Sequence, residues 1–228
     1  MRYHKSPKRI YFLMSSFIVC CLILSGCLSD IGDEEKPEFG KQDLWDWTHI
    51  NSDAREISVF EAIDILLNHI NEIYPGGNIT DFGATESTGK GSNRETGKCQ
   101  GWQFYLLRYV GGHSKSRIVN IAEFGWAEVI AEHDVADIYP EWKYENATID
   151  STSLPSIAMD HDDVKSFVND HPDYVMDIQS YHGPPIESDE ESYLVMYTGG
   201  DDELNVYISA QDGRIIEVKD PNDWSWFE

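Results

Sequence analysis

Apolar residues recur every three or four positions between residues 57 and 74, and this spacing predicts an amphipathic helix. Its apolar face is made of Val59, Ile63, Leu66, Ile70 and Ile73. Ser58 and Glu61 have the spacing of a capping box, in which two side chains satisfy free backbone N–H groups at the helix start. The run Tyr74-Pro75-Gly76-Gly77 ends the predicted helix.

Alternating apolar and polar residues after this helix predict an antiparallel meander. The predicted strands cover residues 79–86, 102–110, 117–124 and 126–130. Residues 137–156 are rich in Pro, Ser, Thr and Asn and have no apolar period, which predicts a linker.

The same order of elements returns after the linker. Asp160 is placed to cap a helix over residues 161–170, and the strands that follow are expected at 174–181, 192–198, 204–210 and 214–218. Residues 119–123 align with residues 206–210 in their apolar pattern. We therefore expect an α+β protein built from two tandem helix-plus-antiparallel-sheet units, residues 44–136 and 157–228, that arose by internal duplication.

The end of the second unit resembles a known family. Residues 206–218 read Val-Tyr-Ile-Ser-Ala-Gln-Asp-Gly-Arg-Ile-Ile-Glu-Val, a strand with small residues, an Asp-Gly turn and a short apolar return. This stretch resembles a PepSY-type unit; the likeness covers residues 157–218, and residues 57–130 match only in element order. It implies a non-catalytic module of an exported protein. Some such modules are proposed to restrain or chaperone proteases, and an inhibitor of secreted β-lactamase has a similar tandem outline.

The start of the chain has the pattern of an export signal. Four basic residues precede an apolar run over residues 10–24, which is short for a bilayer span of about 20 residues. Leu24-Ser25-Gly26-Cys27 resembles a prokaryotic lipobox, which implies a diacylglyceryl thioether on Cys27 and, in bacteria, removal of residues 1–26. The alternative is an uncleaved signal anchor with an incidental Cys. Either alternative places the rest of the chain on the extracytoplasmic face of the cell membrane, because the basic flank stays inside.

The charge of the chain excludes some partners. The 202 residues from Cys27 onward contain 13 basic and 41 acidic residues, a formal charge of −28. This balance argues against nucleic acid and anionic lipid headgroups as partners, because both are negatively charged. The simplest interpretation of the charge is that it keeps the protein soluble. Residues 27–43 are acidic without an apolar period and are expected to form a tether between membrane and domain.

Cysteine usage predicts no internal disulfide. Cys20 and Cys21 lie in the apolar run and Cys27 is the lipid candidate, which leaves Cys99 alone. Cys99 follows a Gly/Ser/Lys-rich stretch, so we expect an idle exposed thiol. An intermolecular disulfide is the alternative.

Candidate chemistry is sparse. The densest group of potential ligands, which we expect to be helix-capping residues, is Asp160, His161, Asp162, Asp163, Asp170 and His171. Weak calcium binding is the alternative, although no EF-hand loop is present. The acidic runs 189–191 and 201–203 are expected to be solvated turns, and His133 and Asp134 to be surface residues. Asn78 and Asn146 begin glycosylation sequons, which matter only in a host that glycosylates exported proteins.

No known catalytic motif is present: the sequence has no Gly-x-Ser-x-Gly, His-Glu-x-x-His or phosphate-binding glycine loop. We therefore expect no cofactor, no metal and no enzymatic activity. The sequence predicts a lipid-anchored lipoprotein whose duplicated domain binds or modulates another extracytoplasmic protein, such as a protease. The rival hypotheses are a small enzyme with an unrecognised site and a cation- or solute-binding lipoprotein. A buried pocket with His beside a carboxylate favours the enzyme, and melting that depends on calcium favours the cation-binding protein.

Overall fold

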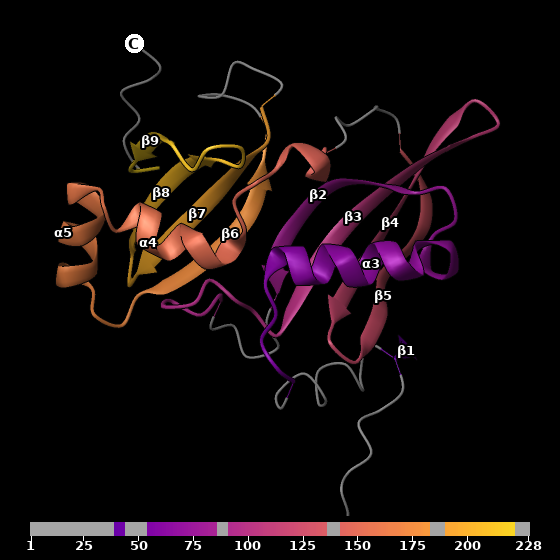
Figure 1. The fold of residues 1–228 in the computed structure, drawn as a ribbon, viewed down its shortest axis with the longest axis horizontal. Coiled ribbons are helices and arrows are strands. Elements are labelled where there is room, and N and C mark those ends of the chain that lie inside the picture. Colours follow the sequence, from indigo (N-terminus) through magenta and orange to yellow (C-terminus); the bar gives the residue numbers. More distant parts are fainter. Residues whose placement is uncertain (1–38, 44–53, 86–90, 136–141, 183–189, 222–228) are drawn as a thin grey trace, which may run out of the picture. The chain divides into compact units, whose positions relative to one another are not determined.

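A computed structural model describes residues 39–43, 54–85, 91–135, 142–182 and 190–221, and its strands form one nine-stranded sheet (Figure 1). The order across the sheet is β1-β5-β4-β3-β2-β6-β7-β8-β9. The strands are β1 (Gly40–Gln42), β2 (Asn78–Thr85), β3 (Gly101–Val110), β4 (His113–Ala122), β5 (Gly125–Val135), β6 (Val175–Tyr181), β7 (Ser192–Gly199), β8 (Asp202–Ser209) and β9 (Ile215–Lys219). The helices are α3 (Val59–Ile73), α4 (Leu154–Ala158) and α5 (Asp162–Asp170), with 3₁₀ turns η2 (Tyr144–Asn146) and η3 (Ser151–Ser153).

The expected fold of two tandem helix-plus-sheet units is wrong. β2 and β6 pair antiparallel, with Gly83 opposite Gln179, so the strands before and after the predicted linker belong to one sheet. β1 pairs in parallel with β5, which makes the sheet mixed. The repeated element order predicts which strands follow each helix, but it carries no information on how two edge strands meet.

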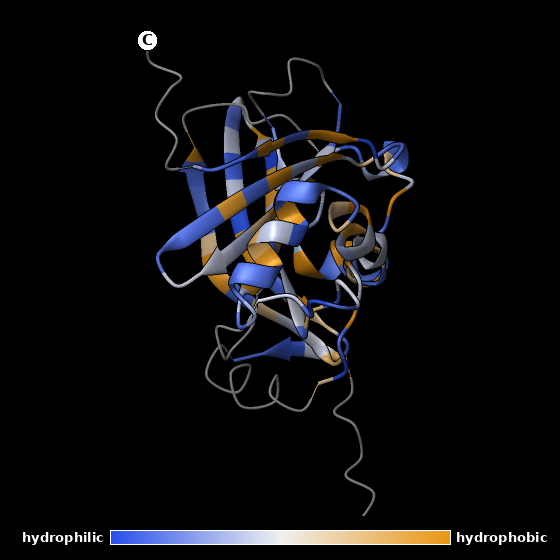
Figure 2. Ribbon diagram, turned by 90° about the vertical axis from the view of Figure 1, so that its left-hand side faces the viewer, coloured by the Kyte–Doolittle hydropathy of each residue, from blue (hydrophilic) through white to orange (hydrophobic). Residues whose placement is uncertain are grey.

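The helices all pack on one face of the sheet, which we call the helix face (Figure 1). Alternation along the strands directs Phe104, Val119 and Val195 to this face, and Figure 2 shows hydrophobic and hydrophilic residues alternating along the strands. The other face, which carries Tyr105, Ile118, Gln179 and Leu194, is called the opposite face.

One hydrophobic core runs beneath the helices. It includes Leu66 of α3, Phe104 of β3 and Val206 of β8, all with no exposed surface. The ring of Phe82 lies 4.9 Å from Trp142 and 6.1 Å from Tyr193, edge-on to both. The stretch predicted as a linker therefore supplies core residues, because Trp142 and Leu154 are buried in this cluster.

The start of α3 has the predicted capping box. The Ser58 hydroxyl accepts a hydrogen bond from the Glu61 N–H at 3.2 Å, and the Glu61 carboxylate accepts one from the Ser58 N–H at 2.8 Å. The η3 region adds two more acceptors, since Asp150 and Ser151 receive the N–H groups of Phe60 and Val59. The free N–H groups of the first turn are thus satisfied both locally and from 90 residues further along the chain.

We expect Ser58→Ala to lower the free energy of unfolding by about 1 kcal/mol, because the Glu61 N–H loses its acceptor. Urea unfolding of residues 28–228, which include every described residue, measures the change. Ser156→Ala is the control: Ser156 is exposed, and its hydroxyl donates only to the nearby carbonyl of Ser153. Equal stability of the two variants would contradict the role of the cap.

Several sequence-based expectations lie outside the described residues. These are the signal at 1–26 with Cys27, the tether except for residues 39–43, and the end of the second expected unit, residues 222–228. Within the described residues, no helix is long and apolar enough to span a membrane.

Candidate functional site

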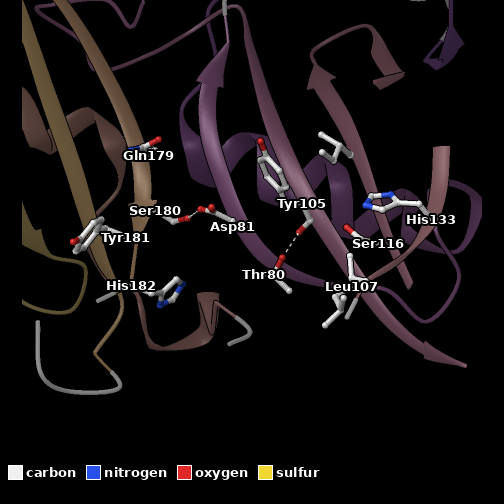
Figure 3. A pocket seen from close by; sticks show the side chains of 12 residues that line it. Thr80, Asp81, Tyr105, Leu107, Ser116, His133, Gln179, Ser180, Tyr181 and His182 are labelled. Carbon is white, nitrogen blue, oxygen red and sulfur yellow. Dashed lines mark hydrogen bonds between the residues drawn. The ribbon is translucent and has the colours of Figure 1, made fainter. Parts of the chain in front are cut away.

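A hollow of about 730 Å³ lies on the opposite face, where β2 meets β6 (Figure 3). Its apolar and aromatic lining consists of Tyr105, Leu107, Ile118, Val135 and Tyr181. Its main polar lining consists of Asp81, His133, Gln179, Ser180 and His182. Apolar walls with a few polar groups are typical of ligand sites, which range from about 300 to 1,000 Å³.

The position of Asp81 depends on an irregularity in β2. Ile79 pairs with Leu106 and Asp81 with Tyr105, so one residue of β2, Thr80, has no partner on β3. The Thr80 hydroxyl donates to the Tyr105 carbonyl at 3.1 Å. Such a bulge changes the direction of a strand locally and re-aims its side chains, and here it lies beside the hollow.

Two hydrogen bonds hold the carboxylate of Asp81. Its Oδ1 accepts the hydroxyl of Ser180 (Figure 3). It also accepts the N–H of Phe82 at 2.8 Å. Among the described residues, no hydrogen bond is made to Oδ2. Burial raises the pKa of Asp81 above its ordinary value of 3.8, and the two hydrogen bonds and nearby His182 offset only part of that rise.

Large apolar side chains are exposed on β3 and β5, and some of them lie on the same face as the hollow. Among the described residues, the exposed large hydrophobic side chains are Tyr105, Tyr109, Val110 and Ile130, all on β3 and β5. Tyr105 is 36 % exposed and Ile130 is 44 % exposed, and the register places both on the opposite face through their shared partner Ile118. An exposed apolar patch next to a hollow indicates a contact surface.

The potential ligands predicted after the linker do not converge. His161 caps α5, accepting the Asp163 N–H at 3.3 Å, while Asp162 pairs with Lys165 and His171 with Asp202. Helix capping is therefore seen, but by His161 instead of Asp160. Among the described residues, no group of three or more His, Cys, Asp or Glu is arranged to hold a metal ion.

Two expectations about single residues are wrong. Cys99 is 2 % exposed and its thiol lies 2.9 Å from the Thr85 carbonyl, because its loop forms a β-bridge with Ile57 at the start of α3. Glu191 is also 2 % exposed, and its carboxylate accepts the Lys143 N–H at 3.1 Å. Cys99 is thus unsuited to an intermolecular disulfide, and Glu191 does not lie in a solvated turn.

Other candidate residues remain predictions. Asn78 and Asn146 are both exposed, which glycosylation requires, and the Asn146 amide donates to Glu191 at 3.4 Å. Asp81 was missed by sequence reasoning, although one signal was present: a carboxylate inside the predicted strand 79–86 goes against strand propensity, and such conflicts gather at functional sites. His133 was expected to be a surface residue, and it is exposed at the rim of the hollow.

Comparisons with known proteins assign this chain to no family. No protein family model matches the sequence, and no curated protein is similar to it. Among solved structures, a crystal structure of a presumed lipoprotein from Clostridium difficile 630 has a TM-score of 0.47 and 8 % identity, covering 75 % of this chain and 97 % of that chain. The resemblance of residues 157–218 to a PepSY-type unit therefore stays a prediction.

We expect Asp81→Asn to make the protein as stable as the parent or more stable at about pH 7. The raised pKa means that the ionised carboxylate costs folding free energy above the folded-state pKa, and this cost is absent below the ordinary value of 3.8. The Asn carbonyl accepts the same two hydrogen bonds. Thermal melts of the variant and the parent between about pH 7 and about pH 3 test this expectation. The melting temperature of the variant should exceed that of the parent by an amount that shrinks as the pH falls.

Asp201→Asn is the matched control, because it removes the same charge from an exposed turn between β7 and β8. A clear loss of stability in Asp81→Asn at about pH 7, absent from Asp201→Asn, would show that the carboxylate favours the folded state.

Proposed function

We propose that this chain is a lipid-anchored extracytoplasmic lipoprotein whose folded domain binds another exported protein through the hollow and the apolar residues beside it. The main support for a binding role is that the side chains of Tyr105, Tyr109 and Ile130 are exposed beside a hollow of about 730 Å³. The lipobox-like run ending at Cys27 supports the anchor. The role is non-catalytic, and an exported protease is the first class of partner to test.

A protein partner fits this surface better than a small solute does. The apolar side chains extend beyond the hollow, since Tyr109 is 69 % exposed at the end of β3 and is not part of the lining. A small ligand would leave Tyr109 in water, whereas a protein covers both the hollow and its surroundings. Aromatic side chains of this kind are enriched in protein interfaces.

Cys27→Ser tests the anchor. We expect the parent protein to stay with the membrane fraction of its host through salt washing, because stable anchoring takes two acyl chains and a diacylglyceryl group supplies both. The variant should lose the lipid and leave the detergent-rich phase on phase separation. Cys99→Ser is the matched control and should keep the lipid. A Cys27→Ser protein that stays firmly in the membrane would support the signal anchor instead.

Site-specific photocrosslinking tests the binding face. We expect a benzophenone amino acid at position 105, introduced in host cells, to form an adduct with one exported protein. The same group at position 71, an exposed Asn on α3 across the sheet, should form no such adduct. Mass spectrometry of the adducts reads out both positions. Adducts at position 71 alone, or at neither position, would contradict binding at this face.

A further inference from the structure

Cationic side chains of β3 and β4 are confined to the helix face. Arg117 donates to the Ile73 carbonyl at the end of α3 at 2.7 Å, and Arg108 pairs with Glu132 and stacks on the Tyr74 ring. Lys115 pairs with Asp134 at 3.1 Å. Each of these three cations is therefore engaged on the side away from the hollow.

The lining of the hollow has the reverse composition. Its described residues include one carboxylate, Asp81, and neither Lys nor Arg. The Asp81 carboxylate is half-buried and accepts two hydrogen bonds on Oδ1 from neutral donors. A carboxylate that is partly removed from water is costly, and His182, which also lines the hollow and is charged only when protonated, offsets only part of that cost. A cation delivered by a ligand would relieve the rest.

The walls suit a cation carried on an apolar stem. Tyr105 and Tyr181 both line the hollow, and the Tyr181 ring is held edge-on against Tyr207 at 4.7 Å. Aromatic faces attract ammonium and guanidinium groups. Leu107 and Ile118 provide the apolar surface along which the methylene stem of Lys or Arg packs.

We propose that the hollow binds a Lys or Arg side chain presented by an extended segment of the partner protein, with the charged head at Asp81. The proposal rests on the proposed function and names the chemistry of its partner. A volume of about 730 Å³ exceeds that of one side chain, so flanking residues of the segment enter as well. The acidic character of the chain, −28 from Cys27 onward, steers a basic partner toward it.

Pooled peptides test this proposal without knowledge of the partner. Each pool holds random nine-residue peptides with one fixed central residue: Lys, Arg, Gln or Glu. Immobilised residues 28–228 are exposed to each pool at moderate salt, and the retained peptide is quantified. We expect the Lys or Arg pool to be retained about tenfold more than the Gln pool, because a charge-assisted hydrogen bond replaces a neutral one.

Two variants test whether the preference for basic peptides depends on the hollow. Asp81→Asn should reduce the ratio of basic to Gln pools to near one, and Asp201→Asn, which removes the same charge from a distant turn, should keep it. A ratio in Asp81→Asn equal to that of the parent would overturn the proposal. Equal retention of Lys and Gln pools by the parent would overturn it as well.

Two further outcomes separate this inference from the proposed function. If Lys and Gln pools are retained equally but both are lost in Tyr105→Ala, the face binds protein segments and only the cationic specificity is refuted. If the parent retains no pool while a chain ending at Pro221 does, the chain's own tail occupies the hollow and the proposal is refuted. Crosslinking at position 105 then decides the proposed function independently.

Discussion

The antiparallel pairing of β2 with β6 is the contact on which the rest of the structure depends. It joins β1–β5 to β6–β9, and it brings the Phe82 ring into the same aromatic cluster as Trp142 and Tyr193. It also brings Ser180 to Phe82 and Asp81, where its hydroxyl accepts the Phe82 N–H at 3.0 Å and donates to Asp81. The same junction therefore closes the core on the helix face and builds the floor of the hollow on the opposite face.

Local signals in the sequence predicted most elements, because helices and strands depend on nearby residues. The apolar period and the Ser58–Glu61 box place α3 within two residues of its observed start and one residue of its end. β4 and β5 are longer than predicted, since their polar ends, such as Lys115 and Glu132, find partners on neighbouring strands. Strand pairing between distant segments has no such local signal, which is why the sequence indicates two sheets where the structure has one.

The candidate site could be predicted only in part for the same reason. Lys and Asp residues in a strand can face either side, and their face follows from register and bulges, which are fixed by tertiary contacts. Asp81 lies in a predicted strand, but its neighbours Ser180 and His182 are about 100 residues away in sequence. No spacing rule connects them. Cys99 shows the converse: its loop composition suggests exposure, but a β-bridge to Ile57 buries it.

The sheet separates charge between its two faces, and this separation links stability to binding. On the helix face, Arg108 and Arg117 flank the Tyr74 ring at 4.6 and 5.0 Å. Arg117 donates to the Ile73 carbonyl at the end of α3 and Arg108 to the Pro75 carbonyl just beyond it, where cations interact favourably with the helix dipole. The strand register directs these cations to the helix face, so none of them lines the hollow. The hydrogen bonds to Asp81 therefore come from neutral donors. A fold that places its cations beneath a helix thereby keeps an acidic, aromatic hollow on its other side. Asp81 couples the two properties, because the burial that costs folding free energy also leaves its carboxylate ready to accept a cation.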